Sequence, residues 1–254
     1  MIKLRLLHVG VHLLSGLLQC ALLFPFLAPA GRNALVRRWS CAMLRVFRIH
    51  LVVSGPGQGA AAGAVVANHV SWIDVFVLNA IGTCRFVAKS EVRAWPAIGW
   101  LSARAGTVYV ARGARAGLTS ANATIAAHLG AGERLAFFPE GTSGPQGSLL
   151  PFHANLFQGV IAADAPVHPV AIAYVGADGQ LSAAAEYIGA MSLWESIVSL
   201  LRHGPFEARV ALLAPIASTG SARRALAAQA EAAIGASLAL CQRPPDTSMK
   251  VPVV

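Results

Sequence analysis

Charge is scarce in this chain of 254 residues: only 12% of the residues are Asp, Glu, Lys or Arg, whereas 56% are hydrophobic. Soluble globular domains carry about 25% charged residues. The high apolar content excludes an intrinsically disordered chain and disfavours an ordinary cytosolic protein. The length predicts one domain with room for an appended element. Contact with a membrane is the first inference from this composition.

Acidic residues are missing from the N-terminal part of the chain, where the first one is Asp74. The basic residues before it have no counter-charge: Lys3, Arg5, Arg32, Arg37, Arg38, Arg45 and Arg48. A basic segment suits either nucleic acid or an anionic lipid surface. A nucleic-acid-binding domain would carry a basic stripe on a polar surface, whereas these residues flank and alternate with apolar ones. We therefore expect a membrane, and no nucleic acid, as partner.

Cysteine pairs and the common cofactor motifs are missing as well. The four cysteines lie far apart and form no C-x-x-C pair, so neither a zinc site nor a disulfide framework is indicated. The chain has no P-loop, no G-x-G-x-x-G after a strand and no H-E-x-x-H. It also lacks the G-x-S-x-G elbow of α/β-type serine hydrolases. We expect no metal and no cofactor.

A long uncharged run extends from Leu6 to Ala30, with basic residues on both sides. As a helix with a rise of about 1.5 Å per residue, it would exceed the roughly 30 Å hydrocarbon core of a bilayer. Histidines, glycines and prolines interrupt the run, so a kinked or monotopic insertion is an alternative to a straight span. The basic start and Ala28-Pro29-Ala30 also imitate a secretory signal with its cleavage site. We rank an uncleaved anchor above a signal peptide, for a reason that follows from the chemistry below.

The segment from Asn33 to Val53 repeats apolar residues at helical spacing, with arginines between them. This pattern predicts a helix that lies in the membrane interface with its arginines at the head groups. The alternative is a core helix with a solvated face. We therefore expect residues 1–53 to form membrane-anchoring or interfacial helices, residues 64–241 the main domain, and residues 242–254 a loose tail.

Beyond residue 63, short apolar runs alternate with helical patterns. Strands are predicted over residues 64–67, 86–88, 107–110, 134–138, 167–174 and 208–213. Helices are predicted over residues 71–81, 98–105, 119–129, 152–163 and 222–240. Such alternation predicts an α/β fold with a largely parallel sheet flanked by helices.

Polar residues follow four of the predicted strands at their carboxyl ends. They are Asn68-His69, Lys89-Ser90-Glu91, Arg112 and Glu140-Gly141-Thr142. Ligands of open α/β sheets bind outside the carboxyl ends of the strands. We therefore expect the chemistry at this rim.

His69 and Asp74 form an H-x4-D pair. Five residues of a regular helix turn by about 500°, so the two side chains would not share a helical face. The pair works if His69 precedes the helix and folds back toward Asp74. The carboxylate would then accept from one ring nitrogen and leave the other basic. A capping Asn68 or Ser71 beside an incidental His and Asp is the alternative.

Two further features suit an anionic or polar ligand. Gly141 allows close backbone approach beside the carboxylate of Glu140, and Arg112 offers a guanidinium after its strand. Each has an ordinary alternative, because Pro-Glu-Gly-Thr also makes a common β-turn.

Taken in order, the H-x4-D pair, the segment from Gly106 to Arg112, the Phe138-Pro139-Glu140-Gly141-Thr142 turn and the strand that begins at Val167 resemble the four blocks of the glycerolipid acyltransferase family. The resemblance covers roughly residues 65–174. It implies transfer of an acyl group from acyl-CoA or acyl-carrier protein to a lipid hydroxyl, with no acyl-enzyme.

The resemblance also implies roles for individual residues. His69 would be the general base, oriented by Asp74. The acceptor's head group would be bound by Arg112, Glu140, Gly141 and Thr142. Because the donor thioesters are cytosolic, the site would face the cytoplasm, at the inner membrane of a bacterium. This orientation is the reason for ranking an anchor above a signal peptide.

The third block departs from the family at Ser143, where arginine is common, and His153 stands where a stronger base is often found. The serine and the Ala185–Gly189 stretch are similar to the branch that acylates lyso-ornithine lipid, whose head group carries no phosphate. We expect 1-acyl-sn-glycerol-3-phosphate as acceptor, slightly ahead of lyso-ornithine lipid, because Arg112 remains. A non-catalytic lipid-binding or lipid-transport protein on a membrane surface is the alternative from another class, and the intact His–Asp pair argues against it.

Overall fold

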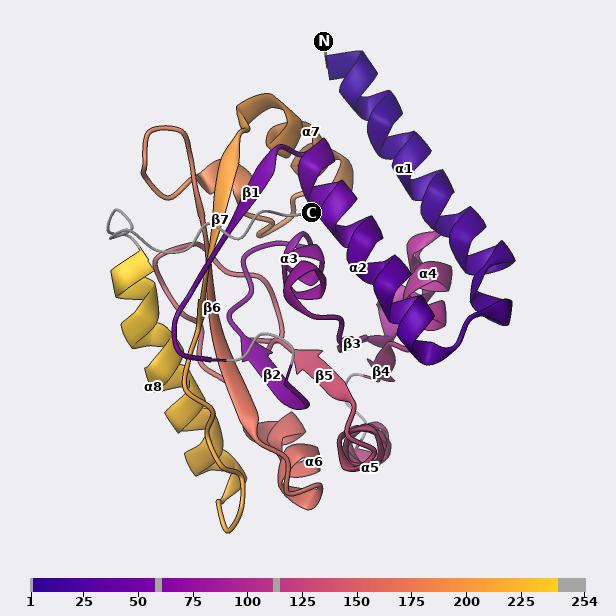
Figure 1. Cartoon of the computed structure of the whole chain (residues 1–254). Helices are drawn as coiled ribbons and strands as arrows, with labels where there is room; N and C mark the ends of the chain where they lie inside the picture. The colour runs from indigo at the N-terminus through magenta and orange to yellow at the C-terminus, as the bar shows by residue number, and fades with distance from the viewer. Residues whose placement is uncertain (1, 58–60, 112–114, 242–254) are drawn as a thin grey trace.

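Seven strands form one sheet in the order β1-β7-β6-β2-β5-β3-β4 (Figure 1). The computed structural model describes residues 2–57, 61–111 and 115–241. The strands are β1 (Ile49–Ser54), β2 (Gly63–Ala67), β3 (Arg85–Lys89), β4 (Val108–Val110), β5 (Arg134–Phe137), β6 (Val167–Val175) and β7 (Phe206–Leu212). Within the described residues the neighbouring strands pair in parallel, apart from β6 and β7, which are antiparallel. The predicted α/β class with a largely parallel sheet is confirmed.

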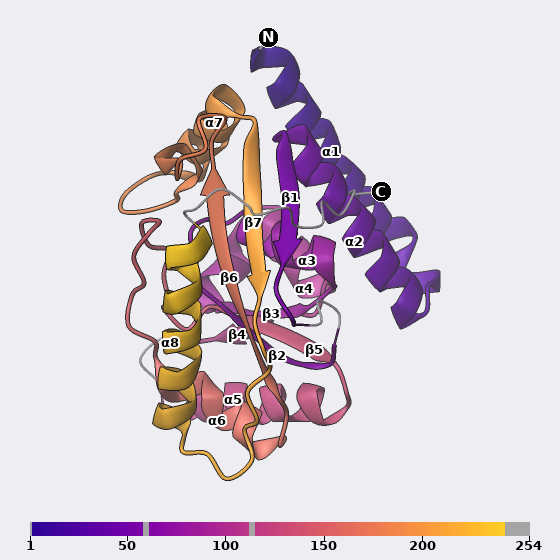
Figure 2. The same ribbon diagram turned by 60° about the vertical axis from the view of Figure 1, so that its left-hand side comes forward.

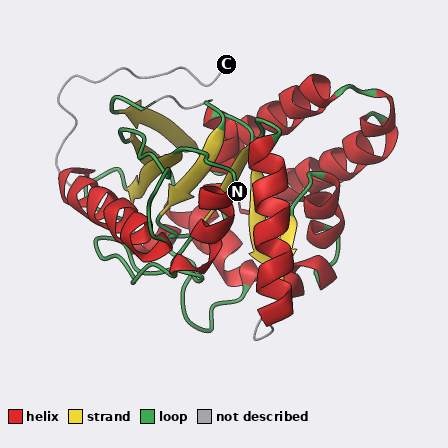
Figure 3. Ribbon diagram, turned by 90° about the horizontal axis from the view of Figure 1, so that it is seen from below, coloured by secondary structure: helices red, strands yellow, loops and turns green. Residues whose placement is uncertain are grey.

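Helices cover both faces of the sheet (Figures 2 and 3). One face packs against α1 (Ile2–Leu22), α2 (Pro29–Val46), α3 (Asp74–Ile81) and α7 (Leu193–His203). The other packs against α5 (Arg115–Gly130), α6 (Phe157–Ala162) and α8 (Arg223–Cys241). The central strands β2 and β6 are buried along their whole length. Strands covered on both faces are continuous apolar runs, which is why their positions could be predicted.

The two N-terminal helices pack closely through Trp39 of α2. The ring of His12 stacks on Trp39 with centroids 4.8 Å apart, and a Cβ at Gly16 would come within 2.7 Å of the indole. Gly16 is therefore the residue that lets α1 approach α2. A guanidinium hydrogen bond of 2.8 Å from Arg5 to the carbonyl of Leu201 also joins α1 to α7.

The predicted helix over Asn33–Val53 is wrong beyond Val46. The helix ends there, Arg48 adopts a left-handed conformation with φ of 57°, and β1 then pairs with β7. The run Ile-His-Leu-Val-Val has the β-branched composition of a strand. Helix α2 itself buries Met43 and Leu44 in the core, and its exposed arginines lie on the outer side. The position of this exposed side in the membrane interface stays a prediction.

Other predicted helices differ at their starts. Helix α3 begins at Asp74, three residues later than expected, and α6 is preceded by the 3-10 helix η3 (Ala154–Leu156). Helix α7 was not predicted, although Ser192 and Glu195 form a capping box at its start. Between β3 and β4 lie the 3-10 helix η2 (Ser90–Ala94) and α4 (Ile98–Arg104). The predicted tail over residues 242–254 lies outside the described residues.

Helix α1 carries an apolar stripe on its outer face. The stretch Ile2–Phe26, which includes the 3-10 helix η1 (Phe24–Phe26), is long enough and apolar enough to cross a membrane. An 18-residue window within it has a mean hydropathy of 1.8, and 17% of that window is buried. The exposed apolar side chains of α1 recur every three or four residues: Leu4, Leu7, Val11, Leu14, Leu18 and Leu22. A core helix of a soluble protein would cover such a stripe.

Candidate active site

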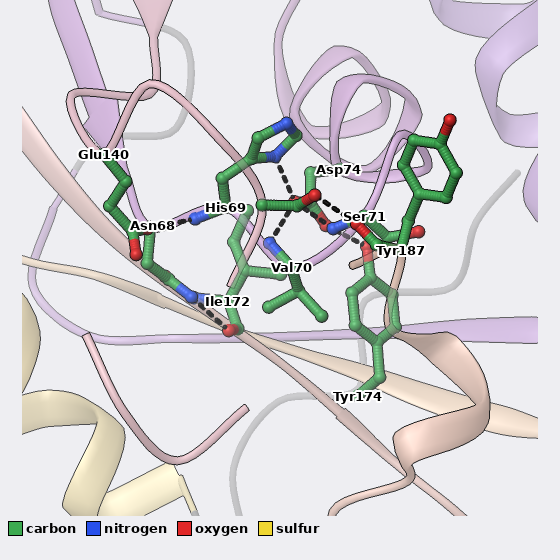
Figure 4. A network of polar contacts seen from close by, with 10 residues as sticks. Asn68, His69, Val70, Ser71, Asp74, Glu140, Ile172, Tyr174 and Tyr187 are labelled. Atoms are coloured by element: carbon green, nitrogen blue, oxygen red, sulfur yellow. Dashed lines mark hydrogen bonds and ion pairs between the residues drawn. The ribbon is translucent and has the colours of Figure 1, made fainter. Parts of the chain in front are cut away.

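The loops after β2 and β5 meet at the carboxyl edge of the sheet, where β6 runs past them (Figure 4). Because β2 and β5 are parallel neighbours, the residues that follow each strand come out on the same side. The backbone N–H of Gly144 donates to the carbonyl of His69 at 2.8 Å and so fixes one loop on the other. This is the rim at which the sequence predicted the chemistry.

His69 and Asp74 are in direct contact, with 2.8 Å between Nδ1 and Oδ2. The same carboxylate oxygen accepts the backbone N–H groups of Val70 and Ser71 at 2.8 and 2.9 Å. Asp74 therefore ties down the turn that starts α3, and this turn folds His69 back onto its partner. The local geometry that the H-x4-D spacing required is present.

The second oxygen of Asp74 has a partner as well. The phenol of Tyr174, on β6, donates to Oδ1 at 2.6 Å. Asp74 is fully buried, and four donors of the protein meet its carboxylate. Such donors offset the cost of burying a carboxylate.

One ring nitrogen of His69 is left for chemistry. Since a carboxylate only accepts, Nδ1 carries the proton of the bond to Asp74, and Nε2 is the basic nitrogen. Nε2 has no hydrogen-bond partner in the part of the chain that the structure describes. The ring stacks on Phe138 with centroids 4.0 Å apart, and 21% of the side chain is exposed. The imidazole is thus held on one face and open to a ligand at Nε2.

Glu140 reaches the site with a contact that the sequence did not predict. Its Oε1 accepts the backbone N–H of His69 at 2.6 Å and its Oε2 accepts that of Leu150 at 2.9 Å. Burial, together with the negative charge of Asp74, raises the pKa of Glu140 above its ordinary value, although these two N–H donors act in the opposite direction. Both oxygens bind the main chain, so Glu140 holds His69 in place.

Gly141 and Thr142 follow Glu140 at the surface of the same turn. Gly141 has φ of 68°, which favours glycine, and its N–H donates to the carbonyl of Phe138 at 3.0 Å. A Cβ there would lie 3.3 Å from the ring of His153. Thr142 is exposed beside it. Arg112, the remaining predicted binding residue, lies outside the described residues.

A segment far along the chain closes the other side of the site. The hydroxyl of Ser143 donates to the carbonyl of Tyr187, whose own N–H donates to the carbonyl of Val70 at 3.0 Å. Tyr187 also lines an open pocket of about 280 Å³ with Trp95, Pro96, Ile98 and Leu193. An apolar pocket of this kind suits a ligand with a hydrocarbon chain.

The sequence identified His69, Asp74 and Glu140 but gave no role to Tyr174, and it marked Tyr187 only as part of the Ala185–Gly189 stretch. Both tyrosines contact the site from segments distant in the chain. No local motif marks Tyr174, which the sequence places only at the end of a strand.

The chain is similar in sequence to several known proteins. The model of the Acyltransferase family matches residues 56–173. A lyso-ornithine lipid O-acyltransferase of Pseudomonas aeruginosa is 38% identical over 207 residues, which are 82% of this chain and 79% of that protein. A 1-acyl-sn-glycerol-3-phosphate acyltransferase of Neisseria meningitidis serogroup B is 36% identical over 160 residues, 63% of each chain.

Among solved structures, the 1-acyl-sn-glycerophosphate acyltransferase PlsC of Thermotoga maritima has the same fold. The TM-score is 0.69 at 19% identity, and the alignment covers 97% of this chain and 100% of that one.

Proposed function

Because the chain belongs to the acyltransferase family, we propose that the His69–Asp74 site moves a fatty acyl group from a thioester to the hydroxyl of a lysolipid. The protein is an acyltransferase. The observation that carries the assignment of the site is the dyad itself: a buried, fully satisfied carboxylate fixes Nδ1 of His69 and leaves Nε2 open. A lipid-binding or transport protein would need a cavity but no such pair.

In the proposed reaction, Nε2 of His69 accepts the proton of the acceptor hydroxyl while its oxygen attacks the thioester carbonyl. The new C–O ester bond forms, the C–S bond breaks, and the proton passes from His69 to the leaving thiolate. The negative charge of Asp74 stabilises the imidazolium that forms in between. General-base catalysis of this kind contributes about 10²–10⁴-fold in rate. No acyl-enzyme and no cofactor is needed.

The other residues of the site support the dyad or are proposed to bind the substrates. Glu140 fixes the main chain of His69, and Gly141 and Thr142 offer an exposed turn next to the dyad. Arg112 is proposed as a cation for the acceptor's head group, as the family resemblance implies. The pocket beside Tyr187 is proposed to take a hydrocarbon chain of a substrate.

For the acceptor we propose lyso-ornithine lipid, ahead of the lysophosphatidate that the sequence alone favoured. Where the family commonly has an arginine, Ser143 is neutral and already bonded inside the protein to the carbonyl of Tyr187. A phosphate would lose the charge-assisted contacts that a guanidinium supplies. The relative from Pseudomonas aeruginosa, matched over 82% of this chain, bears the name of that activity.

The acceptor is tested with detergent-purified protein offered both lysolipids, each with acyl-CoA and with acyl-carrier protein. We expect kcat/KM for lyso-ornithine lipid to exceed that for lysophosphatidate by about 10-fold or more, because a hydrogen bond to a charged group contributes about 1.5–3 kcal/mol. Ser143→Arg should raise turnover of lysophosphatidate, whereas the matched variant Ser148→Arg, at an exposed serine nearby, should not.

Lysophosphatidate is the second candidate, supported by the Neisseria relative. Preferential turnover of lysophosphatidate by the unmodified protein would establish it as acceptor and show that Ser143 is compatible with a phosphate. The arms with the two donors distinguish acyl-CoA from acyl-carrier protein. Both donors are cytosolic, so we propose that the site faces the cytoplasm, in a bacterium at the inner membrane.

We propose that the stretch Ile2–Phe26 attaches the protein to the membrane through the exposed stripe of α1. The catalytic part then extends over residues 49–241, because β1 belongs to its sheet.

Replacing two leucines of this stripe, Leu7→Glu/Leu14→Glu, should lower the recovery of the protein with floated anionic vesicles by about 10-fold or more, since each leucine forfeits roughly 1.5–3 kcal/mol of burial. The matched variant Ala225→Glu/Ala228→Glu, on the exposed side of α8, should float like wild type. Undiminished flotation of the leucine variant would contradict this attachment.

A further inference from the structure

Strand β6 extends past the end of its neighbour β2 near the active site. Its pairing with β2 runs from Val167 to Val170, and β2 ends there, opposite Ala67. Beyond this point β6 continues to Val175 with β7 on its other edge. The edge that faces the dyad therefore has backbone groups that no strand satisfies, and buried backbone groups need partners.

Two side-chain amides take the place of the missing strand. Asn68 accepts the N–H of Ile172 at 2.8 Å and donates to its carbonyl at 2.9 Å. Two residues on, Gln146 accepts the N–H of Tyr174 at 2.6 Å and donates to its carbonyl at 3.2 Å. Alternate residues of a strand present their N–H and C=O groups to the same edge, and Ile172 and Tyr174 are such a pair. The two amides therefore make the hydrogen bonds that a neighbouring strand would make. They fix the backbone that carries the Tyr174 side chain.

The Tyr174 side chain then points at the dyad (Figure 4). Its ring is fully buried, and its phenol lies 2.6 Å from Oδ1 of Asp74. Burial, together with the negative charge of Asp74, raises the pKa of Tyr174 well above its usual range. The phenol therefore stays protonated and remains a donor throughout the pH range in which proteins are stable.

The two oxygens of Asp74 are held from different directions. Oδ2 is fixed by the turn before α3, and Oδ1 by Tyr174 on the sheet. Without the phenol, the carboxylate would be anchored at one oxygen only and could rotate, taking the His69 ring with it. The other buried oxygen would also be left unsatisfied.

We propose that Tyr174 is a positioning residue of the acyl transfer: its phenol fixes the carboxylate of Asp74, and through it His69, in the reactive orientation. The inference rests on the proposed function. Tyr174 does not reach the substrate in this arrangement, because its hydroxyl is occupied by Asp74 and its ring is buried. Its effect is therefore on turnover and not on substrate binding.

The test is Tyr174→Phe, which removes one oxygen and keeps the ring. We expect kcat to fall by about 10- to 100-fold, the range of a hydrogen bond to a charged group. The KM values for acceptor and donor should stay within about 2-fold of wild type. Thr219→Val is the matched control, because its hydroxyl also donates to a carboxylate at 2.6 Å, that of Asp164, and not to the dyad. It should keep wild-type kcat.

Three results would overturn the inference: a Tyr174→Phe variant with wild-type kcat, one with raised KM and unchanged kcat, or an equal loss of kcat in Thr219→Val. If Tyr174→Phe does not fold, Gln146→Ala replaces it, since the side chain of Gln146 bonds only to the backbone of Tyr174 and of Ser182. Its kcat should fall by about 3-fold or more at constant KM, and an unchanged kcat would overturn the inference. Absence of transfer by wild type would instead contradict the proposed function.

Discussion

Replacing His69 with alanine is expected to lower kcat for acyl transfer by about 10²–10⁴-fold, the range that general-base catalysis contributes. Nε2 of His69 is the open basic nitrogen of the site, and the carboxylates near it are occupied: Asp74 by four donors and Glu140 by two. Neither can take over as base without losing the bonds that hold the loop. Steady-state rates of ester formation measure the loss.

The fold and the membrane binding of His69→Ala should be preserved, because the ring, which stacks on Phe138, is partly exposed. His203→Ala serves as the matched control, since His203 is exposed at the end of α7 and bonds only to the carbonyl of Ser199. It should retain wild-type rates. A His69→Ala variant within about 10-fold of wild type would show that another group removes the proton.

Replacing Asp74 with asparagine is expected to lower kcat by about 100-fold or more while the protein stays folded. Three N–H donors converge on Oδ2, so the amide oxygen must occupy that position and the NH₂ group must face Tyr174. The phenol can rotate and accept from it. The His69 tautomer is then kept and only the negative charge is lost, so the variant measures how much that charge stabilises the imidazolium.

Asp178→Asn is the control, because it removes a carboxylate charge away from the dyad. Asp178 is an exposed carboxylate that accepts the N–H of Gln180 at 3.0 Å in a turn, a contact that asparagine can also make. Its rates should not change. If Asp74→Asn were folded and fully active, the carboxylate would serve only to shape the turn before α3, and the dyad would not be the catalytic unit.

Much of the fold could be predicted from local patterns because its central strands are apolar on both faces. The runs that became β2, β5 and β6 have this character, and each was placed within one or two residues. Strand β1 was missed because its pairing is with β7, which joins Ile49 to Phe206. Local periodicity cannot show such a partner, and the helical pattern of α2 leads directly into it.

The candidate site was predicted in part for the same reason. The polar residues after β2 and β5 could be placed at one rim from topology alone, since parallel strands end on the same side. The direction in which each side chain points could not be predicted from topology. Glu140 was expected to face a substrate, but it binds the N–H groups of His69 and Leu150. Tyr174 contacts Asp74 across 100 positions of sequence, which no motif spans.

The most direct test of the central claim, transfer of an acyl group to a lysolipid hydroxyl, is to record thiol release and ester formation together in the acceptor assay described above. The account predicts that thiol is released only when a lysolipid is present, with one ester formed per thiol. It also predicts that His69→Ala abolishes both signals in parallel. Release of thiol without acceptor would indicate thioester hydrolysis, and absence of ester with every acceptor and donor would contradict the proposed function.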